Sequence, residues 1–487
     1  MTDSKRVDAI VIGSGAGGAV TAMTLAGAGM SVAVLEEGAN VPRREYGKSS
    51  PEGMAQLFRR SGMTPILGRV PIGFVEGRCV GGSTEVNSGF WHRAPREVLL
   101  SWQSRFDLQG ATESELVPHY EWAEQRLSVS PYPGEWPKST KLFQRGIDAM
   151  GWAVREIPRT APGCQSANTC ASGCASGKKQ GMSQGLLPEA KAAGANILSH
   201  CRVKLLLRQG RRVTGVLAEI TRDNGSVELV RIDADHVFVC AGASQTPTLL
   251  RQSGLRYKVG DQLRLHPMLK LTARFPQPVN AQNSVLPLLQ VNEFWPEISL
   301  GGAYFSSGHL AFLLGDNWPQ LSMEMEHQNH FASYYVAVRG NGRGSVRPSA
   351  LGNGDTALRY DLSVDDLRSM SRGVARLATL LLAAGAEAVY PAIRSIPVIR
   401  TELDAVRWLT ELLPAKDLSL TTVHAFSSCP MGEQAGLTAA NSYGRVHHVD
   451  NLYVNDASML PDSPGVNPQG TVMALARRNA LHFVDSL

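Results

Sequence analysis

Short apolar runs separated by a glycine-rich turn mark the start of the chain. Ala9 to Ile12 is a continuous apolar run, a turn rich in glycine follows, then an Ala- and Leu-rich segment, and Val32 to Leu35 is a second apolar run. Uninterrupted apolar runs of this length are typical of strands that are buried on both faces of a parallel sheet. The pattern therefore predicts a βαβ unit over residues 7–38.

A longer stretch, residues 202–241, alternates apolar and polar positions. Three alternating segments between residues 203 and 232 are separated by turns, and the second turn contains Asn224-Gly225. Asn-Gly between alternating segments is a strong hairpin signal. We therefore predict a small antiparallel meander, followed by a separate buried strand at Val237–Cys240 that returns to the first sheet.

Residues 276–420 mix aromatic residues and methionine with polar turns, which predicts a second domain built on an antiparallel sheet, with a helix from about Asp365 to Ala384. Residues 323–327 alternate Met and Glu before a His. A strand with alternating faces is the favoured interpretation, and carboxylates that line a substrate pocket are the alternative. Residues 40–70 show no clear period, which predicts a loop or lid.

Composition narrows the range of functions. The 487 residues carry 48 Lys and Arg against 43 Asp and Glu, and this net charge of +5 is too low for a dedicated nucleic-acid binder. No apolar run reaches the ~18–20 residues that a transmembrane helix needs. The polar start shows no secretory signal, so a cytoplasmic location is expected. The basic pairs Arg59-Arg60 and Arg211-Arg212 are expected to be ordinary solvated charges.

The glycine turn has the spacing of a dinucleotide-binding loop. Gly13, Gly15 and Gly18 follow a predicted strand and open a predicted helix, so backbone N–H groups at the helix N-terminus can receive a pyrophosphate. Glu36 ends the second strand, where a carboxylate accepts hydrogen bonds from a ribose diol. This motif predicts a dinucleotide but leaves NAD and FAD open.

Four further segments resemble the signatures of the glucose-methanol-choline family of FAD oxidoreductases. They are, in chain order, residues 77–87, residues 242–255, residues 260–267 and a C-terminal run that includes residues 444–446, 451–458 and 465–468. Arg256 departs from the family pattern, which usually has glycine there. Because the blocks keep the family's order along the chain, the resemblance favours FAD over NAD.

The resemblance implies an α/β fold with two domains. The first is a doubly wound, Rossmann-like FAD-binding domain made of residues 1–275 and 421–487, with insertions at about 40–70 and 130–185. The second is an α+β substrate domain, residues 276–420, with an antiparallel sheet.

The same resemblance implies how the cofactor is held. Some family members attach the flavin covalently through a His where this chain has Val86, so a non-covalent FAD is expected. The further cofactor contacts that the resemblance implies are Arg78, Gly81, Gly82, Ser83, Asn87, Val203, Ala241, Asp456, Ala457 and Pro468.

The catalytic prediction concerns His424 and Asn467. Oxidation of an alcohol needs a base for the hydroxyl proton while hydride leaves the carbon, and a neutral imidazole suits that task. The segment from His424 to Gly432 resembles the family's active-site His block, and Asn467 lies where members place His or Asn. Since an Asn holds a substrate oxygen but takes no proton, the resemblance implies His424 as base and Asn467 as orienting group.

Cysteine is scarce except in one cluster. The seven cysteines are odd in number, which favours reduced thiols over a disulfide framework. Cys164, Cys170 and Cys174 are close enough in sequence to be iron–sulfur ligands, and multi-subunit sugar dehydrogenases of the family resemble this region and use three cysteines for a three-iron cluster. The alternative is three free cysteines in a loop. Long-chain alcohol oxidases also resemble this region.

These observations predict an FAD-dependent oxidation of an alcohol CH–OH group to a carbonyl, with the proton going to His424 and hydride to flavin N5. A primary alcohol on an aliphatic or sugar-like scaffold is the expected small-molecule substrate. The electron acceptor stays open, and an acceptor protein is one candidate. The rival interpretations are a non-redox lyase or photoenzyme on the same scaffold, and the flavin subunit of an iron–sulfur sugar dehydrogenase.

Overall fold

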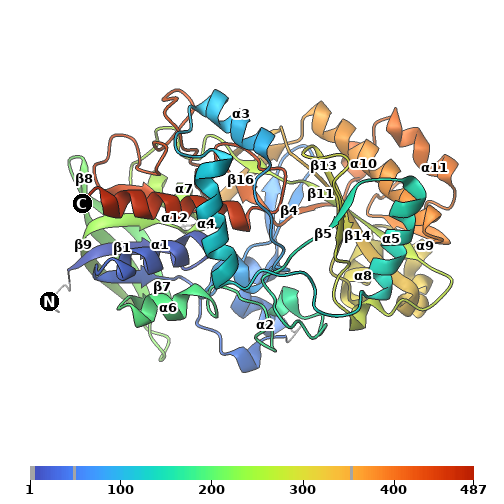
Figure 1. The fold of residues 1–487 in the computed structure, drawn as a ribbon, viewed down its shortest axis with the longest axis horizontal. Coiled ribbons are helices and arrows are strands. Elements are labelled where there is room, and N and C mark those ends of the chain that lie inside the picture. The colour runs from blue at the N-terminus through green and yellow to red at the C-terminus, as the bar shows by residue number, and fades with distance from the viewer. Residues whose placement is uncertain (1–5, 48–50, 351–354) are drawn as a thin grey trace.

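Two sheets organise the chain, one toward each end of the molecule (Figure 1). The computed structural model describes residues 6–47, 51–350 and 355–487. Both ends of the chain lie at the side that holds the first sheet. The prediction of an α/β protein with a doubly wound, Rossmann-like first domain and a second domain on a largely antiparallel sheet is confirmed.

The first sheet has the strand order β6-β2-β1-β9-β8-β7, and β20 pairs with β9. The strand β1 (Val7–Ile12) runs parallel to β2 (Val32–Leu35), and the helix α1 (Ala16–Gly27) connects them, as the apolar runs predict. The other strands are β6 (Asn196–Leu198), β7 (Cys201–Gln209), β8 (Arg212–Thr221), β9 (Val227–Val239) and β20 (Leu452–Val454). Its helices include α6 (Leu186–Ala192), α7 (Gly242–Gln252) and the C-terminal α12 (Gln469–Asp485).

The meander differs from its prediction at one place. The last hairpin strand and the buried strand at 237–240 form one continuous strand, β9. Its first half pairs antiparallel with β8, and its second half pairs parallel with β1. The first half of β9 projects beyond the core, and its second half lies between β1 and β20. Because the strand changes from exposed to buried along its length, the sequence pattern resembles two separate strands.

The second sheet has the order β15-β16-β3-β4-β18-β11-β14-β13-β12-β5, with β17 on β11. Early segments contribute three of these strands: β3 (Thr64–Leu67), β4 (Ile72–Phe74) and β5 (Val154–Glu156). The rest are β11 (Met268–Arg274), β12 (Leu289–Val291), β13 (Ile298–Gly302), β14 (Phe331–Val338), β15 (Arg343–Pro348), β16 (Thr356–Asp361), β17 (Ala388–Pro391) and β18 (Leu420–Thr422). A short pair, β10 (Arg264–Leu265) with β19 (Ala425–Phe426), lies apart.

Helices cover the second sheet. The predicted helix near 365–384 is α10 (Val364–Ala383), whose apolar side packs into the same core as the sheet. A Ser363 capping box starts it, because the Ser363 hydroxyl accepts from the Asp366 backbone and the Asp366 carboxylate accepts from the Ser363 backbone. Further helices are α5 (Lys138–Met150), α8 (Ser307–Leu314), α9 (Trp318–Leu321) and α11 (Glu402–Val406), and α3 (Arg96–Phe106) and α4 (Glu113–Arg126) lie between the sheets in Figure 1.

Two local predictions are wrong. Residues 323–327 are not a strand but belong to a 3₁₀ segment, Ser322–His330, that carries the chain into β14. Residues 40–70 are not a plain loop: they contain the helix α2 (Pro51–Leu57) and the strand β3, while residues 48–50 of the predicted lid lie outside the described residues. Sheet pairing with distant strands decides the second case, since β3 pairs with β4 and β16.

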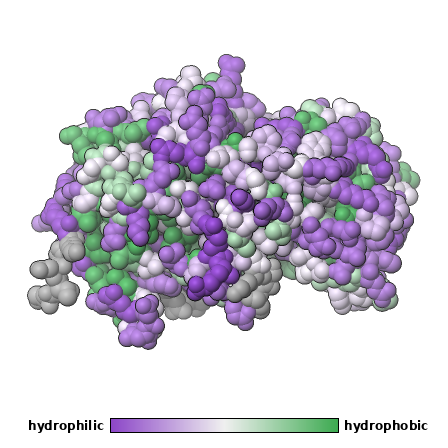
Figure 2. All heavy atoms as spheres, turned by 60° about the horizontal axis from the view of Figure 1, so that its bottom comes forward, coloured by the Kyte–Doolittle hydropathy of each residue, from purple (hydrophilic) through white to green (hydrophobic). Residues whose placement is uncertain are grey.

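The surface is largely polar. Figure 2 shows apolar side chains gathered toward the end that holds the first sheet, where Leu205 of β7 and Val227 and Leu229 of β9 are exposed. Within the described residues, no helix has both the length and the apolar character that crossing a bilayer requires.

Candidate active site

A cavity of about 880 Å³ is lined by residues of both sheets. It contains both predicted catalytic residues, His424 and Asn467. Of the predicted cofactor contacts, all line it except Gly18 and Gly81; the lining ones are Gly13, Gly15, Glu36, Arg78, Gly82, Ser83, Asn87, Val203, Ala241, Asp456, Ala457 and Pro468. The fold therefore brings sequence-distant predicted residues to one place.

The glycines of the first turn have two different tasks. A Cβ on Gly13 would lie 2.4 Å from the Cys240 carbonyl oxygen, and one on Gly18 would lie 2.0 Å from the Gly13 oxygen, so these two allow α1 to pack closely on the strands. A Cβ on Gly15 meets no described atom within 4 Å, and Gly15 lines the cavity. Gly15 therefore keeps space open in front of the helix N-terminus.

The N-terminus of α1 suits an anionic group. Gly15 is its N-cap residue, no side chain caps the helix, and the first turn carries no acidic residue. The backbone N–H groups of a first helical turn have no partner within the helix and carry the positive end of its dipole. The polarity of this helix end is the one that favours an anion such as a pyrophosphate.

Glu36 is buried at the end of β2. Its carboxylate accepts the Ser14 N–H (3.0 Å), the Ser14 hydroxyl (2.7 Å) and the Gly38 N–H (2.8 Å). Burial raises its pKa, against these hydrogen bonds. Ser14 also accepts the Gly81 N–H at 3.0 Å, so the glycine turn, the acidic residue and the 77–87 segment form one network. Gly81 therefore does not line the cavity but is hydrogen-bonded to Ser14, which does.

Asp456 closes the opposite side of the same turn. Its carboxylate is buried and accepts from the Gly242 N–H at 2.8 Å and from the backbone of Ser458 at 2.7 Å. The Thr246 hydroxyl also donates to it, at 2.5 Å. Burial raises its pKa. The carboxylate therefore ties the start of α7 to the loop that precedes α12.

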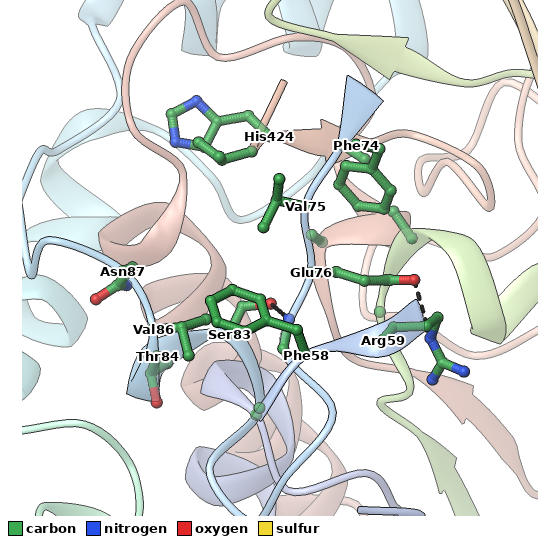
Figure 3. A pocket seen from close by; sticks show the side chains of 18 of the residues that line it. Phe58, Arg59, Phe74, Val75, Glu76, Ser83, Thr84, Val86, Asn87 and His424 are labelled. Carbon is green, nitrogen blue, oxygen red and sulfur yellow. Dashed lines mark hydrogen bonds and ion pairs between the residues drawn. The ribbon is translucent and has the colours of Figure 1, made fainter. Parts of the chain in front are cut away.

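The 77–87 segment forms the cavity wall across from His424 (Figure 3). The Ser83 hydroxyl accepts the Gly77 N–H at 2.9 Å, and Asn87 bonds to Gly89 and Gln469. Val86, where a covalent flavin link would need a His, also lines the cavity. Its side chain has no atom that could form such a link.

A histidine pair lies in the cavity wall. His424 Nε2 is 3.4 Å from Asn467 Nδ2, and His424 Nδ1 is 3.1 Å from His266 Nδ1. His266 Nε2 is 2.8 Å from the Ser463 hydroxyl. Because an amide nitrogen only donates, Nε2 of His424 is the accepting nitrogen, Nδ1 carries the proton and donates to His266, and His266 donates to Ser463.

Both histidines are neutral at neutral pH. Burial lowers the pKa of His424 to about 4. Burial, and then the charges of His424 and Arg339, hold the pKa of His266 well below its usual range. His424 therefore presents an unprotonated Nε2 to the cavity beside Asn467. The sequence singled out the segment that contains His266 but gave that residue no role.

Arg59 is not a solvated charge, which corrects the prediction for the Arg59-Arg60 pair. Its side chain is only 13% exposed, and its guanidinium pairs with Glu37 and Glu76, each at 3.0 Å. Figure 3 shows Arg59 and Glu76 side by side in the cavity wall. Arg211, in contrast, is 70% exposed and pairs with Asp450, as expected for a surface charge.

The three clustered cysteines do not form a metal centre. Within the described part of the chain, no group of three or more His, Cys, Asp or Glu side chains is placed to hold a metal ion, so the predicted iron–sulfur cluster is not supported. The sulfurs have other neighbours. Arg159 donates to Cys164 (3.7 Å) and Cys170 (3.3 Å), and the Lys179 N–H donates to Cys174 (3.4 Å). The guanidinium occupies the space between the first two thiols.

Comparison with known proteins identifies the family of the chain. Two GMC oxidoreductase family models match residues 8–268 and 341–476. An uncharacterized GMC-type oxidoreductase of Sinorhizobium fredii is 40% identical over 97% of this chain and 94% of its own length. A long-chain-alcohol oxidase of Arabidopsis thaliana is 27% identical over 97% of this chain and 67% of its own length.

A solved structure supports the fold. The crystal structure of pyridoxine 4-oxidase from Mesorbium loti has a TM-score of 0.71 at 18% identity and covers 98% of this chain and 99% of that one. The matched models span most of the chain, and the resemblance predicted from the sequence motifs is confirmed. The chain belongs to the GMC oxidoreductase family.

Proposed function

We propose that the protein is an FAD-dependent oxidoreductase that oxidises an alcohol CH–OH group to a carbonyl. The observation that carries the proposal is the unprotonated Nε2 of His424 beside the Asn467 amide, in a cavity that begins at a helix N-terminus kept open by Gly15. The names of an alcohol oxidase and a pyridoxine oxidase among its relatives support the reaction class.

The residues fit FAD as a non-covalent cofactor. The N-terminus of α1 would hold the diphosphate, Glu36 would accept from the ribose, and Ser83, Asn87 and Ala457 would lie along the ring system. When bound, the isoalloxazine ring supplies the hydride acceptor. Val86 offers no nucleophile, which supports non-covalent binding.

His424 acts as the general base. When the substrate binds, its hydroxyl replaces the Asn467 amide at the Nε2 lone pair, which takes the hydroxyl proton, and the released Asn467 N–H donates to the substrate oxygen. The Nδ1 proton stays on the hydrogen bond to His266, which holds the ring in this tautomer. His424 is half-buried and lines the cavity, so a substrate bound there would itself displace water from the base.

Anaerobic mixing of the purified protein with a panel of primary alcohols tests the proposal. Bleaching of the visible absorption of the oxidised flavin, together with formation of the aldehyde, is the expected result. Turnover with flavin that stays oxidised, or only under blue light, would contradict it. The electron acceptor is then identified by adding oxygen or an artificial acceptor to the reduced protein.

A further inference from the structure

A half-buried lysine lies in the part of the cavity wall that comes from the second sheet. Lys270 lies on β11 and lines the cavity together with Met268, which shares its face of the strand. His266, which contacts the base, precedes Lys270 by four residues on the same chain segment, so their Cα atoms are at most about 14 Å apart. The lysine therefore lies within reach of a small substrate held at His424.

The ammonium group of Lys270 has no partner of its own. Among the described residues, no carboxylate and no hydrogen-bond acceptor contacts its Nζ, and burial alone lowers its pKa. An ammonium that faces an open cavity can be solvated by water, but a substrate that fills the cavity displaces that water, and enclosing a charge without a partner is costly. A substrate that supplies its own partner for Lys270 avoids this cost, so the position of the lysine points to a ligand.

The acidic residues of the cavity wall do not serve it. These residues lie on the first-sheet side of the cavity or form ion pairs with Arg59. They are Glu36, Glu37, Glu76 and Asp456. Each already accepts from another group. The substrate part of the wall, from β11, β12, β14 with the residue that follows it, and α8, contributes Lys270 and Arg339 but no described carboxylate.

His309 is a second polar residue of this part of the wall. The Ser306 hydroxyl accepts the His309 backbone N–H (3.3 Å) and lies 2.9 Å from His309 Nδ1. Burial, and then the Lys270 charge, lower the pKa of His309 to about 4. His309 also lines the cavity, with Tyr304 edge-on to its ring at 4.7 Å. This corner of the cavity offers donors and positive charge.

We propose that Lys270 binds an anionic group of the substrate, in the simplest case a carboxylate, while the hydroxyl of the same molecule meets His424. The inference rests on the proposed function and narrows its substrate class to alcohols that carry a negative charge. A cationic alcohol would meet an ammonium and no counter-charge. A neutral alcohol would leave the buried charge unpaired.

The test uses ω-hydroxycarboxylates of increasing chain length, each paired with its neutral primary amide of nearly the same shape. Anaerobic stopped-flow flavin reduction gives the apparent Kd of each. At one chain length, wild-type protein should bind the carboxylate roughly 10- to 100-fold more tightly than the amide, as expected for a charge-assisted hydrogen bond. K270M should abolish this preference and K270R should restore part of it, while K191M, at an exposed helical position, should retain it.

A second readout needs no turnover. Calorimetric titration with hexanoate and with hexanamide should show preferential binding of hexanoate to wild-type holoprotein and loss of that preference in K270M. Equal binding of the two probes by the wild type, or an unchanged preference in K270M, would overturn the role of Lys270. If neither the carboxylates nor the amides reduce the flavin but the hexanoate preference is present and lost in K270M, the oxidation chemistry fails and the anion site stands.

Discussion

Substitution of Gly15 or of Gly17, at the start of α1, should separate an effect on cofactor binding from an effect on folding. Gly15 has φ −69° and ψ −164°, an extended conformation that alanine adopts without strain, and a Cβ there meets no described atom within 4 Å. In Gly15→Ala the new methyl group would therefore project into the cavity in front of the α1 N-terminus. At Gly17, two residues later, a Cβ would lie 2.0 Å from the Asn455 carbonyl oxygen.

The expected magnitudes follow from these distances. The Gly15 methyl group displaces a phosphate from one or two backbone N–H donors, each worth about 1.5–3 kcal/mol for a charged acceptor, so FAD should bind roughly 10- to 100-fold more weakly or worse. Loss of a glycine N-cap and reduced freedom of the unfolded chain nearly offset each other, so the free energy of unfolding of the apoprotein should change by less than about 1 kcal/mol. Gly17→Ala should instead cost about 1–3 kcal/mol of stability.

Two assays read the two effects apart. FAD affinity is measured by quenching of flavin fluorescence on titration of apoprotein, and stability by the urea midpoint of the apoprotein. The expected result is a Gly15→Ala protein that folds as the wild type does and binds FAD poorly. Wild-type FAD affinity in this variant would refute the assignment of the α1 N-terminus as the diphosphate site.

Three further predictions concern the histidine pair and the cysteines. Because burial lowers the pKa of His424 to about 4 and only the neutral imidazole accepts a proton, the flavin reduction rate in holoprotein should be flat above about pH 6 and fall as pH drops through about 4. A rate that instead changes with a midpoint near 7 argues against a neutral base. His266→Ala should slow flavin reduction by less than the roughly 10²–10⁴-fold that loss of a base costs, and it should shift the pH profile. An unchanged rate and pH profile would show that His266 does not hold the tautomer of His424. Purified protein should contain no stoichiometric iron by elemental analysis, since Cys164, Cys170 and Cys174 are not placed as a metal site; three irons per flavin would restore the cluster.

Local patterns predicted the elements that depend on near neighbours. The βαβ unit, the hairpin turn at Asn224-Gly225 and α10 all follow from periodicity, turn chemistry and capping within a few residues. The glycine turn could also be predicted, since its spacing and its position after a strand are visible in the sequence. The early strands of the second sheet, β3 to β5, gave no comparable signal, because they are short and pair with strands up to about 350 residues away.

The site's supporting contacts were less accessible for the same reason. His266 and His424 are separated by 158 positions, so no local pattern shows that one fixes the tautomer of the other. Arg59 resembles any surface arginine until the fold places Glu37 and Glu76 around it. Lys270 follows a matched motif, yet its burial without a counter-charge depends on which strands surround it. Spacing alone suggested a metal site for the cysteines, and the intervening Arg159 guanidinium could not be anticipated.

The most direct measurement of the central claim is anaerobic stopped-flow reduction of the His424→Gln holoprotein by an alcohol that reduces the wild type. Glutamine retains a polar side chain but cannot accept the hydroxyl proton. With FAD content equal to the wild type, the rate constant of flavin reduction should fall roughly 10²–10⁴-fold. Reduction as fast as in the wild type would show that another group removes the proton.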